Sequence, residues 1–172
     1  RFRQHVRPAS GSHRIPQLET PSGEVIQDST EIFNYLEQQF EQPAARPSGI
    51  KQQWVCRLIE ALTDSALLQM AWHFRWNFME QNWSFVGREF GRSFRPRGSD
   101  QELDQYGKVI ADRMSGYRSA IGIEQQHFAA LDEIYAELLA LLEQHFIENP
   151  YLFGGLPSIA DHALMGPLFG HL

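Results

Sequence analysis

The chain has 172 residues, 42% of them hydrophobic and 12% aromatic, which is enough for one domain with a substantial core or for two small domains. Its formal net charge of −6 argues against nucleic acid as the main partner, because such a partner requires a basic face. No apolar run is long enough to span a membrane, and the single cysteine, Cys56, excludes an intrachain disulfide and fits a reducing compartment, the cytoplasm. The histidines show no zinc-binding spacing, so we expect no metal site.

The polar and basic residues 1–14 predict a loop or the frayed end of a preceding element. The chain begins with Arg1 rather than methionine and stops at Leu172, within an apolar helical pattern. A two-stranded hairpin such as the one expected next is marginal by itself, because it needs further strands or a packed helix. We therefore expect a piece of a longer protein, truncated at both ends.

Residues 15–36 predict a β-hairpin followed by a helix. Pro16 holds the residue before it in an extended conformation, so residues 15–19 read as a strand. Residues 20–23 form a turn, in which Gly23 supplies the permissive backbone, and residues 24–27 return as the second strand. Apolar residues at helical spacing follow, which indicates an amphipathic helix.

Asp28 and Ser29 mark the start of this helix, because their side-chain oxygens can accept hydrogen bonds from the free amides of its first turn. The usual interpretation of such a pair is a simple helix cap. The same arrangement can also hold a zwitterion, since the amides and the hydroxyl suit a carboxylate and Asp28 suits an ammonium group. The strand that starts at Ile15-Pro16 offers a backbone edge to an extended peptide. Together these features fit a small peptide with a free amino-acid end.

Residues 42–49, rich in proline and glycine, predict a linker between two domains, 1–41 and 50–172. Residues 50–87 then predict one long helix with an apolar residue at every fourth position. The residues that share this stripe are Trp54, Leu58, Leu62, Ala66, Met70 and Phe74.

Aromatic residues are dense in the second half of this helix. The favoured interpretation is a core or an interface, and the alternative is a substrate pocket that includes Trp72, Arg75 and Trp76. The arginine-rich and glycine-rich residues 87–98 predict a solvated loop.

Two further helices are expected over residues 99–122 and 123–146, the first opened by a capping box between Ser99 and Glu102. A second capping box, between Ser158 and Asp161, opens a helix that is apolar on nearly all sides and should be central in a bundle. Gly166-Pro167 should bend or close that helix.

Two of these segments resemble the glutathione S-transferase family. The strand at Ile15-Pro16, the turn at Gly23 and the helix start at Asp28-Ser29 are similar to the second half of the family's thioredoxin-like domain. Gly155, Pro157, Ser158 and Asp161 are similar to the G-x-P-S-x-A-D segment of its helical domain. The implied fold is part of a thioredoxin-like α+β domain, followed by an all-helical domain that is incomplete at its C-terminus.

The resemblance implies that Ile15, Pro16, Asp28 and Ser29 bind glutathione, with a cis peptide bond before Pro16. Ser158 and Asp161 would serve folding. The implied activity is conjugation of glutathione to a hydrophobic electrophile by a cytoplasmic homodimer. The family places its catalytic Tyr, Ser or Cys in a segment that this sequence lacks, so no residue here is expected to be catalytic.

Three interpretations remain open. The first, which we favour, is part of an active transferase. The second is a transferase-like binding or scaffold protein without activity. The third is a helical interaction module whose hairpin resembles the family by accident.

Overall fold

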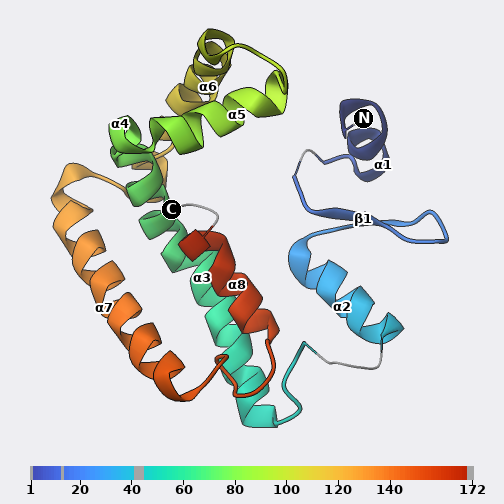
Figure 1. Ribbon diagram of the computed structural model, residues 1–172. Coiled ribbons are helices and arrows are strands. Elements are labelled where there is room, and N and C mark those ends of the chain that lie inside the picture. Colours follow the sequence, from blue (N-terminus) through green and yellow to red (C-terminus); the bar gives the residue numbers. More distant parts are fainter. Residues whose placement is uncertain (1, 13, 41–44, 170–172) are drawn as a thin grey trace. The chain divides into compact units, whose positions relative to one another are not determined.

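The computed structural model describes residues 2–12, 14–40 and 45–169. The chain divides into two compact units, Arg1–Ala45 and Arg46–Leu172 (Figure 1). The first contains an antiparallel hairpin flanked by helices, and the second is built from helices, so the predicted fold class is confirmed. Part of the predicted linker, residues 42–44, lies outside the described residues; residues 45–49 are not helical.

The hairpin pairs β1 (Gln17–Glu19) with β2 (Val25–Gln27), with Leu18 opposite Ile26. Both strands are shorter than predicted. β1 begins only after Pro16, which has no N–H to donate to a ladder. In the turn, the Thr20 N–H donates to the Glu24 carbonyl at 2.8 Å, and Gly23 has a φ of 85°. Only glycine adopts this φ without steric cost, which explains the glycine at this position.

Residues 2–10 are helical, which contradicts a loop there and fits the other expectation for residues 1–14, the end of a preceding element. A π-helical turn, Phe2–Val6, continues into α1 (Arg7–Ser10). Pro8 lies in the first turn of α1, where the missing N–H costs no intrahelical bond. The helix ends at Gly11, whose N–H donates to the Arg7 carbonyl at 2.9 Å.

The second unit is organised around α3 (Ile50–Asn77), along which α8 (Ile159–Phe169) packs (Figure 1). α7 (Phe128–Glu148) also contacts α3. Residues from all three helices, together with Ile123, form the main hydrophobic core: Leu67, Met70, Ile123, Leu131 and Leu164. Five residues of α7 pack in or against this core: Phe128, Leu131, Tyr135, Leu138 and Leu142. α8 runs through Pro167 to Phe169, so Gly166-Pro167 does not end it.

The buried face of α3 is not the predicted one. Trp54 and Leu58 are 71% and 69% exposed, whereas Met70, from the same stripe, is buried. An α-helix turns by about 100° per residue, so a residue at every fourth position advances by about 40° each time. Over the four steps from Trp54 to Met70 the stripe therefore moves by about 160°, to nearly the opposite face. Cys56 is fully buried in α3.

The predicted long helix ends at Asn77. The predicted loop at residues 87–98 is wrong for 88–94, which are helical, while 95–98 form a turn. Met79–Asn82 forms α4, a π-helical turn follows, and α5 (Arg88–Phe94) packs on α6 (Asp100–Ser115). A Cβ atom on Gly91 would lie 2.2 Å from the Leu103 carbonyl oxygen. Gly91 therefore permits close packing of α5 on α6 instead of marking a loop.

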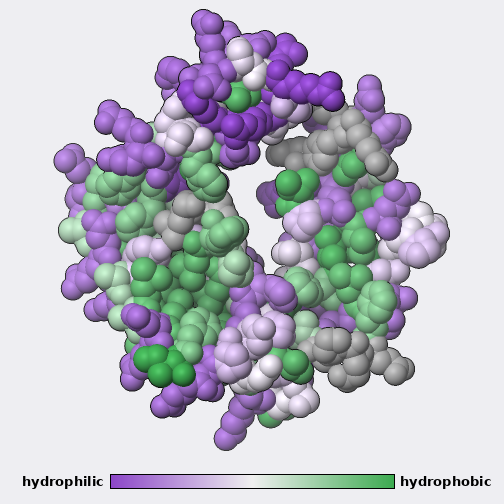
Figure 2. All heavy atoms as spheres, in the orientation of Figure 1, coloured by the Kyte–Doolittle hydropathy of each residue, from purple (hydrophilic) through white to green (hydrophobic). Residues whose placement is uncertain are grey.

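The capping box at the start of α6 is confirmed, with the Ser99 N–H donating to Glu102 at 2.9 Å and the Glu102 N–H donating to Ser99. Figure 2 shows hydrophilic side chains gathered over α5 and α6, and hydrophobic ones over α7 and α8. Within the described residues, no helix has the length and apolar character needed to cross a bilayer.

Candidate functional site

The candidate site lies at the open end of the hairpin. Gln17 and Gln27 are the last pair of the β-ladder. Ile15-Pro16 precedes the first strand and Asp28-Ser29 follows the second, so both pairs of residues lie at this end of the hairpin. The structure thus brings all four predicted site residues to one end of the first unit. All four are exposed, and the Ile15–Pro16 peptide bond is cis, the isomer that the resemblance implied.

Asp28 has an unusual backbone conformation, with φ 97° and ψ 131°. Among the described residues it is the one non-glycine residue with a positive φ. Such a conformation is strained for a residue with a Cβ and costs on the order of 1–3 kcal/mol. Strained residues cluster at functional sites, because the surrounding structure holds a side chain or amide where a ligand needs it.

The same residue caps α2 (Ser29–Gln39). One carboxylate oxygen of Asp28, Oδ1, accepts a hydrogen bond from the Thr30 N–H at 2.9 Å. Its second oxygen and the Ser29 side chain lie at the helix start, where the backbone amides carry partial positive charge. The helix cap is therefore present as predicted. The second carboxylate oxygen, the Ser29 hydroxyl and the backbone amides could still bind a ligand that carries both an ammonium group and a carboxylate.

Sequence reasoning missed Gln17, which supports the entry to the site. Its Nε2 donates to the Arg14 carbonyl at 2.7 Å and to the Ser12 carbonyl at 3.4 Å. These bonds tie the segment before Ile15 to β1. The Oε1 atom of Gln17 is buried and has no hydrogen-bond partner. No local motif identifies this role, because a glutamine in a strand normally points to solvent.

The predicted co-substrate residues lie in the second unit and pack like core residues. Trp76 is 3% exposed and belongs to a cluster with Val86 and Ala111. The Arg75 guanidinium lies 5.9 Å from the ring centroid of Trp76, and burial lowers the pKa of Arg75. Trp72 is half-buried, with its ring centroid 6.2 Å from that of Trp76. This packing favours the interpretation of the aromatic cluster as core.

The predicted folding box at the start of α8 is built mainly by Asp161. Its Oδ2 accepts from the Ser158 N–H at 2.7 Å and from the Ser158 hydroxyl at 2.6 Å. Its Oδ1 accepts from the Leu152 N–H at 2.8 Å, a contact that the sequence did not predict. Asp161 therefore joins the start of α8 to the loop before it.

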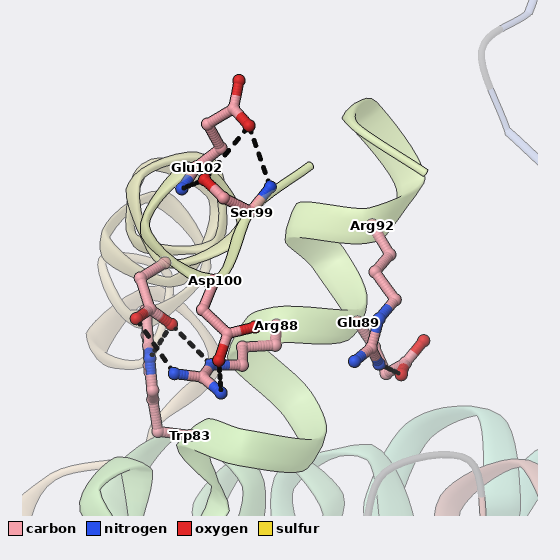
Figure 3. A network of polar contacts seen from close by, with 8 residues as sticks. Trp83, Arg88, Glu89, Arg92, Ser99, Asp100 and Glu102 are labelled. Carbon is pink, nitrogen blue, oxygen red and sulfur yellow. Dashed lines mark hydrogen bonds and ion pairs between the residues drawn. The ribbon is translucent and has the colours of Figure 1, made fainter. Parts of the chain in front are cut away.

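A second polar cluster joins α5 to α6 (Figure 3). The Arg88 Nε and the Trp83 indole N–H both donate to Asp104 at 2.8 Å, and Arg88 also bonds Asp100 at 3.0 Å. Hydrogen bonds from Arg88 and then Trp83 hold the pKa of Asp104 below its usual value. The charges in this cluster are paired with one another, so its role is to fix two helices.

In the part of the chain that the structure describes, no three His, Cys, Asp or Glu residues form a group that could hold a metal ion. Residues 1–44 match the family described as "Glutathione S-transferase, N-terminal domain". This match covers the hairpin and α2, so the N-terminal part of the chain is similar to that domain. Comparison with curated proteins and with solved structures gives no significant match.

Proposed function

We propose that the first unit binds glutathione at the open end of its hairpin, through Ile15, Pro16, Asp28 and Ser29. The observation that carries the proposal is the strained backbone of Asp28, at the start of α2 and beside Ile15-Pro16. A helix cap by itself does not require a positive φ, because ordinary N-cap residues adopt an extended conformation. The similarity of residues 1–44 to a transferase domain supports the same ligand.

Each residue would have a distinct role. The backbone of Ile15 would pair with the extended peptide backbone of the ligand, since it lies beyond the end of the β-ladder. Asp28 would accept from the ammonium group of the γ-glutamyl end. The Ser29 hydroxyl and the first amides of α2 would donate to its carboxylate.

The proposed activity of the full-length protein is conjugation of the glutathione thiol to a hydrophobic electrophile. Such chemistry requires a lowered thiol pKa, which a hydrogen bond and positive potential supply. We name no residue of this chain as catalytic. The cytoplasmic location and the homodimer that the resemblance implied belong to the same proposal.

A non-catalytic binding or scaffold protein is the second candidate. The observation that favours it is the exposed apolar surface of α3, which includes Trp54, Leu58 and Leu62. Exposed apolar patches mark interaction surfaces. Glutathione binding without turnover by the full-length protein would identify this case.

The test is calorimetric titration of the full-length protein with glutathione. Replacing Asp28 by alanine removes a charge-assisted hydrogen bond, so we expect a loss of about 1.5–3 kcal/mol, roughly tenfold or more in affinity. Glu31→Ala is the matched control, because Glu31 is an exposed carboxylate in the same first turn of α2. Equal affinities of the Asp28 variant and the unmodified protein would remove Asp28 from the site.

A further inference from the structure

Four polar side chains are joined by consecutive hydrogen bonds in the second unit. Arg118 donates to the Asn77 Oδ1, the Asn77 Nδ2 lies 2.7 Å from the His73 Nδ1, and the His73 Nε2 lies 3.0 Å from an Asp132 oxygen. His73 is 1% exposed, whereas the Asp132 side chain is 54% exposed. These hydrogen bonds therefore connect α3 both to α7 and to the segment that follows α6.

The direction of every hydrogen bond follows from Arg118. A guanidinium group has only donors, so Asn77 must present its oxygen to Arg118 and its amide nitrogen to His73. The amide nitrogen also only donates, so the His73 Nδ1 must accept and carries no hydrogen. The ring hydrogen is then on Nε2, which donates to the Asp132 carboxylate. This arrangement requires a neutral His73.

A protonated His73 does not fit the same arrangement. Its Nδ1–H would face the amide nitrogen of Asn77, so that two donors oppose each other. Turning the amide over would satisfy the ring but would place the amide nitrogen against Arg118. A charged ring would also lose hydration, because it is surrounded by aromatic rings with centroids 4.7–5.5 Å away. These rings belong to Phe74, Phe78 and Phe128.

The carboxylate of Asp132 is exposed, and an ion pair with a solvated partner contributes little. It therefore offsets only part of the hydration that a charged His73 ring would lose. Among the described residues, the charged groups joined to the ring by hydrogen bonds are Asp132, from α7, and Arg118, through Asn77, from the segment after α6. The same segment is joined to α3 at a second point, where the Gln69 Nε2 donates to the Ile121 carbonyl at 2.8 Å.

We propose that Arg118, Asn77, His73 and Asp132 form an acid-sensitive latch. Protonation of His73 opens the latch and loosens α7 and the segment after α6 from α3. This inference is independent of the proposed glutathione site, because all four residues lie in the second unit and the proposed site residues lie in the first.

The test is hydrogen exchange of the α7 amides at about pH 7.5 and about pH 5.5, corrected for intrinsic exchange. We expect acid to lower the protection of α7 by roughly tenfold. Asn77→Asp should abolish or reverse this loss, because a carboxylate accepts from both Arg118 and a protonated Nδ1. His145→Gln is the control on α7, since that ring bonds the Tyr151 carbonyl, and it should keep the acid response.

An acid response that is absent from the unmodified protein, or that Asn77→Asp retains in full, would overturn the proposal. If Asn77→Asp does not fold, a second measurement on the unmodified protein still tests the proposal. Nitrogen chemical shifts of the His73 ring should report the neutral form with its hydrogen on Nε2 at neutral pH. A hydrogen on Nδ1 would overturn the latch as described.

Discussion

The two units of this protein are held together in different ways. The second unit has a hydrophobic core in which Leu67, Leu131 and Leu164 are buried. In the described part of the first unit, the one buried residue is Thr20, which lies in the hairpin turn and is 6% exposed. That unit depends on local hydrogen bonds at the turn, the helix cap and Gln17. The buried core therefore lies in the second unit, whereas the proposed glutathione site lies in the unit with little buried surface.

The largest expected effect is at the close contact between α5 and α6. In Gly91→Ala the new methyl group would meet the Leu103 carbonyl oxygen at 2.2 Å, so the helices must separate. We expect a loss of about 3 kcal/mol in the free energy of unfolding of the second unit, the upper end of overpacking effects. Chemical denaturation followed by circular dichroism measures this loss.

Gly166→Ala is the matched control for that experiment. Gly166 lies within α8, and a Cβ atom there would meet nothing within 4 Å. Alanine is the better helix former, but a Cβ before Pro167 disfavours the helical backbone, so the two effects oppose each other and the control should stay within about 1 kcal/mol of the unmodified protein. Equal losses in the two variants would show that close packing of α5 on α6 is not what Gly91 provides.

The box at the start of α8 should give the next largest effect. Asp161→Ala removes the acceptor for three hydrogen bonds, two from Ser158 and one from the Leu152 N–H. We expect a loss of about 2 kcal/mol, more than for an ordinary helix cap, because buried donors are left without partners. Thermal unfolding of this variant beside Ser158→Ala, which should lose about 1 kcal/mol, separates the two contributions.

Asp28→Gly should move stability and binding in opposite directions. Glycine adopts the φ of 97° without strain and is nearly as good a helix cap as aspartate, so we expect the first unit to gain about 1 kcal/mol. Glutathione binding should fall, because the carboxylate is lost. Calorimetry and denaturation on one preparation measure both quantities, and a loss of stability would show that the backbone at Asp28 is not strained.

Several elements could be predicted because their signals are local. The turn at Gly23, the cap at Asp28 and the box at Ser99 each involve residues within a few positions of one another. The glycines of residues 87–98 led to the prediction of a loop. Gly91 is needed because the α6 backbone, which is distant in sequence, packs against it, and the sequence does not show this contact. The exposed face of α3 was missed because a strict spacing of four was taken for one helix face.

The candidate site was predictable in its residue types but not in its geometry. The pair Asp28-Ser29 is visible in the sequence, whereas the φ of Asp28 is set by how β2 passes into α2. The hydrogen bonds that join His73 to Asn77, Arg118 and Asp132 were also not predicted. These four residues come from three segments, and a histidine inside an apolar helical pattern gives no signal of its partners.

The smallest expected effect is the acid response of the α5–α6 pair. Hydrogen bonds from Arg88 and then Trp83 lower the pKa of Asp104 in the folded protein (Figure 3). Their contribution is therefore fully present above the ordinary aspartate pKa, about 3.9, and is lost as the pH falls through the lower folded value. The urea midpoint of the second unit should decline over this range, and Asp104→Asn should reduce the decline. Glu133→Gln, on the exposed surface of α7, should leave it unchanged. A decline of equal size in Asp104→Asn would assign the acid response to carboxylates other than Asp104.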